Sequence, residues 1–444
     1  MQETVGNAAA RFVAEASDRS YAAEIVDAAK MCLIDWVGVA LGAYHEPAVG
    51  VLHRTLAAWR SKGEARILLG PKTSPALAAL INGTMGHCLD FDDTRAKAAS
   101  HLSSPTWSAA LAVAGQQGAG EQETLGAFIT GFEVAAGLGG TAFESKLQFA
   151  GFHPTSVFGR LSAAAATSVL MGLDAVQASH AFGVSATTAG GLNASFGTMS
   201  KPFHSGKAAM DGVLAAELAS EGFVAATHLF DVEQGLAGTL VQDGSVGFDG
   251  IAFTDGRTLL DNSFKPYACG KLIHGHIDAA RKLRDAVGDR HTVRIRCQVA
   301  PIGGKLVGRP APQTPLEAKF SIAFCVALAL LGYPVFATDF TIKRLADPAI
   351  RSLMGCVELE INPAVDNFGS IMDIELEDGT CLHAEVTLSR GNPENPLSWD
   401  DLRFKFENLV EPVLGERTQT LYDVLRHFEQ PGRMAEFLSL VTPL

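Results

Sequence analysis

The sequence predicts a mainly α-helical protein: one large helical domain, interrupted late in the chain by a smaller α+β domain. Helical periodicity runs to about residue 255, alternating patterns appear from about residue 290, and helical periodicity resumes after residue 398. A chain of 444 residues also exceeds the usual size of one domain. We therefore expect a discontinuous helical domain of residues 1–260 and 396–444, with an α+β domain of residues 261–395 inserted.

The helical part shows apolar residues at three- and four-residue spacing. In residues 22–41 this stripe includes Ile25, Cys32 and Trp36, and it is typical of a helix packed on a core. Asp174 is a candidate cap, and Ser104 before Pro105 is another. The 45 glycines mostly accompany small residues, which favours closely packed helices. Similar stretches cover residues 74–85, 105–116, 124–138, 158–171 and 204–221.

The α+β part begins with a strand at residues 292–299, where Val293, Ile295 and Cys297 would share one face. Further strands are expected at residues 357–361, 371–377 and 381–388, with a hairpin turn at 377–380. Helices are expected at residues 315–331 and 340–345. Ser398 and Asp401 then resemble a capping box that starts the last helical region.

Composition excludes several classes of function. A net charge of −13 with only 35 basic residues argues against nucleic acid as a partner. The seven cysteines are scattered without metal-ligand spacing, and no nucleotide-binding or zinc-protease motif is present. The first thirty residues do not resemble a signal peptide, and the most apolar run, residues 324–331, is too short to span a bilayer. We expect a cytoplasmic protein with no membrane partner, no metal and no cofactor.

The densest group of reactive side chains lies in residues 86–101. Asp90, Asp92, Asp93, His87 and His101 fall within fifteen residues of one another, between two helical stretches. Histidine beside aspartate can exchange protons near neutral pH, so this segment is a candidate acid–base site. The alternative interpretation is a polar helix end with Asp92 or Asp93 as a cap.

Three further motifs follow in order: residues 151–156 with His153, residues 198–207 with Lys201, and residues 264–271 with Lys265, closed by His274. Together the four motifs resemble the MmgE/PrpD family, which includes 2-methylcitrate dehydratases, cis-aconitate decarboxylases and iminodisuccinate epimerases. The resemblance covers roughly residues 90–330. It implies a helical domain, a smaller lid domain, a homodimer and a small di- or tricarboxylate substrate.

The family's reactions form a carbanion-like species next to a carboxylate, whose charge preorganised cations stabilise. The resemblance implies that Lys201 and Lys265 supply this charge. Each precedes a proline, which predicts an extended backbone at both lysines. Lys207 is a further candidate for binding substrate, with a helix-surface lysine as the alternative. Lys271 could contribute to a basic pocket, with a solvated turn residue as the alternative, and its loss is expected to have a much smaller effect than that of Lys201 or Lys265.

His101 and His153 are the candidate acid and base, and neither role can be assigned separately. The resemblance implies that Asp90 and Thr94 position them. His274 is a candidate substrate contact or a packing histidine. Arg95 stands where the family often carries histidine, and it could recognise a further carboxylate. Asp92 and Asp93 are interpreted as caps or as orienters of a neighbouring histidine.

We expect a cofactor-independent lyase like 2-methylcitrate dehydratase, with an epimerase of a dicarboxylate such as iminodisuccinate as the alternative. The resemblance implies tyrosine in decarboxylase-like members where this chain has Phe324, which disfavours a cis-aconitate-type decarboxylase and, more weakly, a standard dehydratase. A phenol could deliver a proton and phenylalanine cannot. The last alternative is a non-enzymatic binding protein. The presence of the full set, Asp90, His101, His153, Lys201 and Lys265, argues against it.

Overall fold

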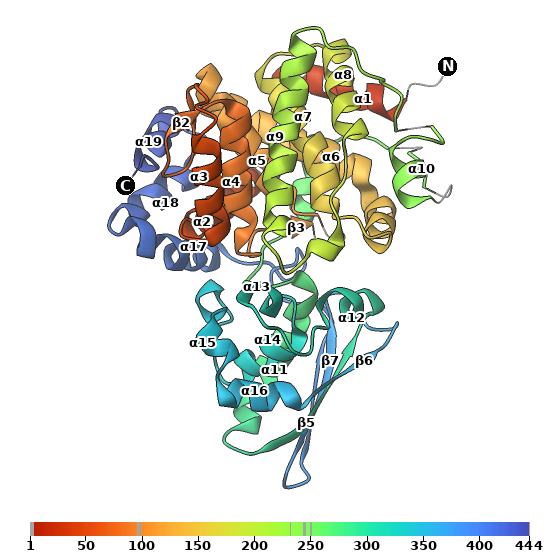
Figure 1. The fold of residues 1–444 in the computed structure, drawn as a ribbon, viewed down its shortest axis with the longest axis vertical. Helices are drawn as coiled ribbons and strands as arrows, with labels where there is room; N and C mark the ends of the chain where they lie inside the picture. The colour runs from red at the N-terminus through yellow and green to blue at the C-terminus, as the bar shows by residue number, and fades with distance from the viewer. Residues whose placement is uncertain are drawn as a thin grey trace.

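The chain forms a mainly α-helical upper body and a smaller lower body that contains a four-stranded sheet (Figure 1). This computed structural model describes residues 4–95, 98, 100–230, 232–242, 246–248 and 251–443. The mainly α class predicted from the sequence is confirmed. No single helix in these ranges is long and apolar enough to cross a membrane; one bent pair, Glu121–Gly140 with Ala142–Phe149, passes only the length and composition test.

The upper body is built from long helices around alanine-rich contacts. Two short strands, β1 (Ala65–Arg66) and β2 (Lys72–Thr73), pair at its edge. Its helices are α1 (Val5–Ala14), α2 (Ala23–Gly42), α3 (Pro47–Ala57), α4 (Pro75–Cys88), α5 (Ser103–Gln117), α6 (Glu121–Phe149), α7 (Pro154–Leu170), α8 (Ala175–Thr187), α9 (Ser200–Ser220) and α10 (Leu236–Val241).

Glycines allow α4 and α9 to pack backbone against backbone. A Cβ atom at Gly83 would lie 2.8 Å from the Cα of Gly206, and one at Gly206 would lie 2.1 Å from the carbonyl oxygen of Leu80. Real side chains do not tolerate such distances, so both positions require glycine. The contact matters for function because it brings the end of α4 close to the start of α9, where Asp90 and Lys201 lie.

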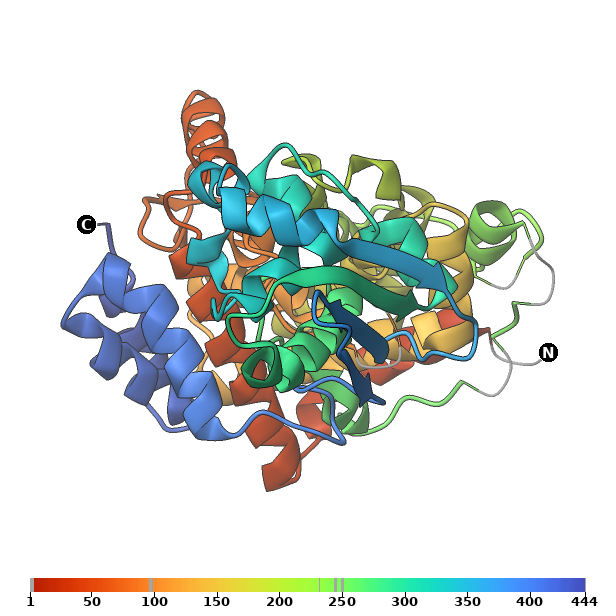
Figure 2. The same cartoon turned by 90° about the horizontal axis from the view of Figure 1, so that it is seen from below.

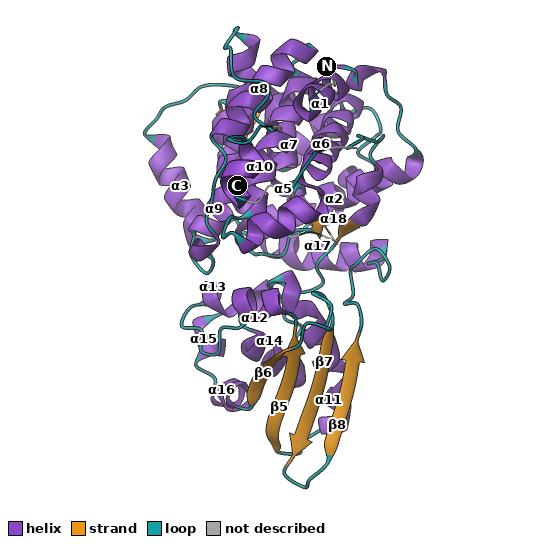
Figure 3. Cartoon of the chain, turned by 90° about the vertical axis from the view of Figure 1, so that its right-hand side faces the viewer, coloured by secondary structure: helices purple, strands orange, loops and turns teal. Residues whose placement is uncertain are grey.

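The lower body carries a mixed sheet with strand order β6-β5-β7-β8, seen face-on in Figure 3. β5 and β6 are parallel and the other neighbours are antiparallel. The elements are α11 (His274–Val287), β5 (Thr292–Val299), α12 (Pro301–Val307), α13 (Pro315–Ala318), α14 (Ile322–Leu330), α15 (Ile342–Leu345), α16 (Pro348–Gly355), β6 (Val357–Ile361), β7 (Ser370–Leu376) and β8 (Cys381–Val386).

Two expectations for this region were wrong. Val293 is 50% exposed while Ile295 and Cys297 are buried, because the register of β5 against β7 shifts between Thr292 and Arg294. A bulge of this kind moves a side chain to the other face of a sheet. The expected helix at 315–331 is two helices, α13 and α14, with a break at residues 319–321.

The C-terminal helices return to the upper body, as Figures 1 and 2 show. α17 (Trp399–Leu414) packs along α2, where a Cβ at Gly38 would lie 3.0 Å from the ring of Phe406. α18 (Arg417–Arg426) and α19 (Arg433–Leu440) follow. The capping box at Ser398 and Asp401 is confirmed. The proposed domain boundaries and the lid role of residues 261–395 stay predictions.

A short antiparallel pair of strands joins the segment after α4 to the segment before the lower body. β3 (Thr94–Arg95) pairs with β4 (Asn262–Ser263). This pairing fixes the chain that carries Asp90 beside the chain that carries Lys265. The candidate site is built around it.

Candidate active site

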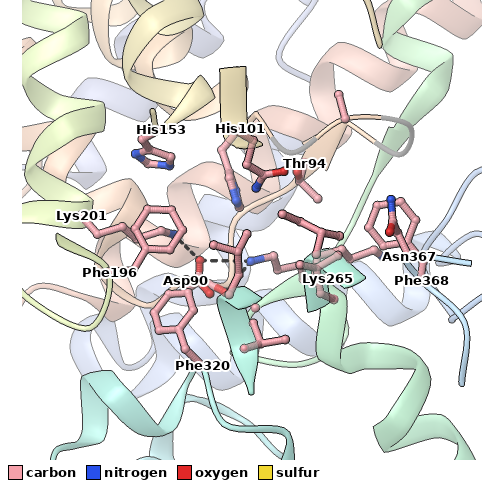
Figure 4. Close-up of a pocket in the computed structure, with 18 of the residues that line it drawn as sticks. Asp90, Thr94, His101, His153, Phe196, Lys201, Lys265, Phe320, Asn367 and Phe368 are labelled. Atoms are coloured by element: carbon pink, nitrogen blue, oxygen red, sulfur yellow. Dashed lines mark hydrogen bonds and ion pairs between the residues drawn. The ribbon is translucent and has the colours of Figure 1, made fainter. Parts of the chain in front are cut away.

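A cavity of about 100 Å³ lies where the two bodies meet (Figure 4). One water molecule needs roughly 10–15 Å³ of such space, so the cavity suits a small molecule. Its polar lining includes Asp90, Thr94, His101, His153, Lys201, Lys265, Lys271 and Asn367, and its apolar lining includes Phe196, Leu272, Ile302, Leu306, Val307, Phe320 and Phe368. Most residues that the sequence predicted for the site therefore meet in one cavity.

Asp90 lies between two lysines at the base of this cavity. Its Oδ1 forms ion pairs with the Nζ of Lys201 and with the Nζ of Lys265, the latter at 3.2 Å. Burial alone would raise the pKa of Asp90, but the two ammonium groups hold it below its usual value. The other carboxylate oxygen is buried without a hydrogen-bond partner among the described residues. The group is thus a fixed negative charge that holds two cations at the cavity.

The backbone at Asp90 is in the left-handed region, with φ of 51°. This conformation costs a non-glycine residue about 1 kcal/mol, so the surrounding contacts must impose it. Asp90 comes directly after Leu89, the residue that caps α4. The turn ends the helix and directs the Asp90 carboxylate toward the lysines.

The backbone at Lys201 is not extended, so the local prediction for this residue was wrong. It lies in the first turn of α9, which begins at Ser200, rather than in an extended segment. Proline is tolerated in a first helical turn because its missing N–H would have no partner there. Burial lowers the pKa of Lys201, while Asp90 opposes that effect. The carboxylate of Asp90 therefore holds the ammonium group of Lys201 in a position buried from solvent.

Asp92 connects two imidazoles behind the cavity. His87 donates from Nδ1 to the carboxylate at 2.8 Å, and the Nδ1 of His101 lies 3.2 Å from the same oxygen. Burial lowers the pKa of both histidines, and it lowers that of His87 to about 3. Both rings are therefore neutral at pH 7. Asp92 fixes the orientation of His101, in agreement with its interpretation as an orienter.

His87 belongs to the first motif, and its sequence position predicted no particular contact for it. Its ring centroid is 4.6 Å from that of His101 and 5.7 Å from that of His153. His87 is in the last turn of α4, while Asp92 lies beyond the turn at Asp90. Only that turn brings the two side chains together, so the spacing alone could not reveal the contact.

His153 occupies the extended position before Pro154 that the sequence predicts, as the N-cap of α7. Its Nδ1 lies 3.1 Å from the Nδ1 of His204, which is only partly buried. Burial holds the pKa of His153 well below its ordinary value. Because His204 occupies Nδ1, Nε2 of His153 is the ring nitrogen left for a substrate.

One group among the described residues has the composition of a metal site. Ligand atoms of His87, Asp92 and His101 lie within 4.8 Å of one another. The imidazole nitrogens already contact the carboxylate, and the nearby ammonium of Lys201 disfavours an added cation. The arrangement fits a hydrogen-bonded His–Asp–His group better than a metal centre. The absence of a cofactor stays a prediction.

The remaining predicted residues differ in position. Thr94 lines the cavity and donates to the carbonyl of Ser100 at 3.2 Å. His274 is buried, with Nε2 3.3 Å from the carbonyl of Cys269, and does not line the cavity. Two basic residues also lie outside the lining: Arg95 pairs with Glu144 at 3.0 Å, and Lys207 pairs with Asp211 on its own helix. Their roles in binding substrate stay predictions.

Lys271 is a cavity residue rather than a solvated turn residue. It is 7% exposed, and its Nζ has no hydrogen-bond partner among the described residues. Burial, with the charge of Lys265 acting in the same direction, lowers the pKa of Lys271 to about 7. Lys405 also lowers this pKa, while Asp278 and Cys269 raise it. An unpaired buried lysine in a cavity is well suited to bind a carboxylate.

From the lowered pKa of Lys271 we expect the binding of an anion to depend on pH. The amine is charged below its pKa of about 7, so affinity for propane-1,2,3-tricarboxylate should fall as pH rises from 7 to 9, by up to about tenfold per unit. Calorimetry measures this directly. Lys271→Met should bind weakly at every pH, and Lys271→Arg should keep its affinity at pH 9. An unchanged pH profile in Lys271→Met would show that the amine does not contact the anion.

Comparison with known proteins gives the family of this chain. Sequence models of the MmgE/PrpD N-terminal and C-terminal domains match residues 7–249 and 267–429. A cis-aconitate decarboxylase-like protein, oryM, of Aspergillus oryzae is 26% identical over 97% of this chain and 96% of its own. The cis-aconitate decarboxylase of Homo sapiens is 29% identical over 80% and 77%, and that of Aspergillus terreus is 24% identical over 94% and 92%.

The fold, the buried acid–base groups and these relatives define an enzyme rather than a binding scaffold. The chain belongs to the MmgE/PrpD family and is a lyase. The resemblance found in the sequence is therefore confirmed. The C-terminal family domain, residues 267–429, includes both the lower body and helix α17.

Proposed function

We propose that this protein is a cofactor-independent lyase of a small tricarboxylate, which forms a carbanion next to a carboxylate. The observation that carries the proposal is the cavity in which Asp90, Lys201 and Lys265, all buried, face two neutral imidazoles. Fixed cations in a water-poor cavity stabilise an enediolate more strongly than water does. The unpaired Lys271 provides a further contact for a second carboxylate.

His153 can deliver or remove a proton without becoming an unstable anion. If His153 donates from Nε2, its Nδ1 can accept a proton from the Nδ1 of His204, 3.1 Å away. His204 is partly exposed and can recover that proton from solvent. His101, held by Asp92, is the second candidate for proton transfer. The His153→Gln and His101→Gln variants distinguish which of the two acts on the reacting carbon.

Decarboxylation is the reaction that we propose first. The carbon–carbon bond to one carboxylate breaks, CO2 leaves, the electron pair stays in the skeleton as an enediolate, and one proton then adds to carbon. The relatives reported above carry decarboxylase names. The expected 2-methylcitrate dehydratase activity has no such support. Phe324 is fully buried against Phe340 and is not among the residues that line the cavity, so it does not argue against decarboxylation.

A substrate screen in heavy water tests the proposal. cis-Aconitate, 2-methylcitrate and iminodisuccinate would each be incubated with the enzyme and followed by NMR. We expect cis-aconitate to lose CO2 and gain one deuterium on carbon. Loss of water from 2-methylcitrate would instead assign a dehydratase, and deuterium uptake without net loss would assign an epimerase. Failure of all three compounds to react or to take up deuterium would contradict proton transfer at this site.

The lower body supplies Lys271 and Phe368 to a cavity whose imidazoles belong to the upper body. We propose that residues 261–395 close over bound substrate as a lid. Joint protection of residues 198–205 and 261–275 from hydrogen exchange by a tricarboxylate would test this proposal. The homodimer and the cytoplasmic location stay predictions.

A further inference from the structure

Three buried lysines donate hydrogen bonds to three consecutive backbone carbonyls at the turn that carries Asp90. Lys319 donates to the carbonyl of Leu89 at 2.6 Å, Lys265 to that of Asp90 at 2.9 Å, and Lys405 to that of Phe91 at 2.6 Å. The lysines come from three separate parts of the chain, and all are buried. Lys265 and Lys405 are also paired with carboxylates, whereas Lys319 forms no ion pair among the described residues. A buried ammonium that donates only to a neutral carbonyl is costly, because its charge is only partly compensated.

The two outer lysines also hold the segment that carries Lys265 and Lys271. The ammonium of Lys405 donates to the carbonyl of Lys265 at 3.0 Å. The carbonyl of Lys319 accepts from the backbone N–H of Gly270 at 2.9 Å. Lys405 and Lys319 therefore each connect the Asp90 turn with the 265–271 segment, one at each end of that segment.

We propose that Lys405 and Lys319 are positioning residues, which fix the left-handed turn at Asp90 against the segment bearing the substrate-binding lysines. Neither lines the cavity, so neither is expected to touch substrate. Without them the Asp90 turn could relax, and its carboxylate would lose its place between Lys201 and Lys265. The kinetic part of this inference rests on the proposed function.

Lys405 also has a charged partner, which defines the competing explanation. Its Nζ lies 2.6 Å from Oδ1 of Asp35 on α2, and the other oxygen of Asp35 accepts from the backbone N–H of Asp93 at 2.9 Å. Lys405 could therefore serve only to neutralise a buried carboxylate. Removing one member of a buried ion pair destabilises a protein because it leaves the other uncompensated. A single Lys405 variant cannot separate the two explanations.

The paired variant Asp35→Asn with Lys405→Met separates them, since it removes both charges and leaves an amide oxygen for the N–H of Asp93. Lys30→Met is the matched control. Lys30 is a buried lysine on the same helix α2, paired with Asp27 and Glu429 and absent from the cavity lining. Thermal unfolding, kcat and KM, and a crystal structure would be obtained for each variant and for Lys319→Met.

We expect the double variant to unfold close to the wild-type temperature and yet to lose at least about tenfold in kcat, with Asp90 outside the left-handed region in its crystal structure. Lys319→Met should show the same loss in kcat, whereas Lys30→Met should lose stability but not kcat. Wild-type kcat and an unchanged Asp90 turn in the double variant would overturn the inference. If the wild-type enzyme turns over no polycarboxylate, the proposed function fails, and the backbone at Asp90 still decides whether the lysines position it.

Discussion

A Lys201→Ala variant is expected to lose at least about a hundredfold in kcat/KM, which is the scale of removing one preorganised donor from a developing negative charge. Lys265→Ala should lose as much, because both ammonium groups contact Asp90 at the cavity. The loss should appear in kcat more than in KM, since the charge on an enediolate exceeds that on the bound substrate. Steady-state kinetics with the substrate found in the heavy-water screen measures both constants.

Lys207→Ala is the comparison for this prediction, and it also tests the two interpretations of Lys207. Lys207 lies on the same helix as Lys201, but it is partly exposed and pairs with Asp211. If Lys207 is the helix-surface lysine of the alternative interpretation, its replacement should change kcat/KM by less than about threefold, as for a partly exposed ion pair, and a larger rise in KM would support its role in binding substrate. Small and equal effects in all three variants would show that the lysines of this cavity do not stabilise the reaction.

Local patterns predicted much of the fold. The strand at residues 357–361, the cap at Asp174 and the extended backbone at His153 all follow from short-range rules, and the structure confirms each of them. They could be predicted because neighbouring residues alone decide them. The break at residues 319–321 could not, since apolar residues at helical spacing continue through it. That break places Phe320 at the cavity and Lys319 on the carbonyl of Leu89.

The motifs predicted the residues that line the cavity better than those that support it. Asp90, His101, His153, Lys201 and Lys265 do meet there. Lys271 was ranked below Lys201 and Lys265 because a lysine in a turn is usually solvated, and only the tertiary structure buries it. Lys405 lies 140 residues after its backbone partner Lys265, so no local pattern could connect them. Tertiary contacts decide which charged groups are buried away from water, and local sequence patterns do not predict these contacts.

The second large effect is expected from His153. A positioned acid or base contributes about 10²–10⁴-fold to a rate, so His153→Gln should lose this much in kcat while binding propane-1,2,3-tricarboxylate about as well as the wild type. The reason is that glutamine can still donate a hydrogen bond from the cavity wall but cannot relay a proton. His101→Gln should lose a similar factor if His101 is the partner in proton transfer, and much less if it only orders the cavity.

His276→Gln controls for the loss of a buried imidazole. His276 lies on α11, bonds to Ser370 at 2.7 Å and does not line the cavity. Its kcat should stay within about twofold of the wild type. The rate of deuterium uptake on carbon is a second measure of proton transfer. A variant that lacks the proton donor should release CO2 and incorporate deuterium equally slowly. A His153→Gln enzyme that incorporates deuterium at the wild-type rate would exclude His153 from proton transfer.

Burial keeps the pKa of His153 well below its usual value, so wild-type activity should persist as the pH falls below 6.5, where an exposed imidazole would already carry a proton.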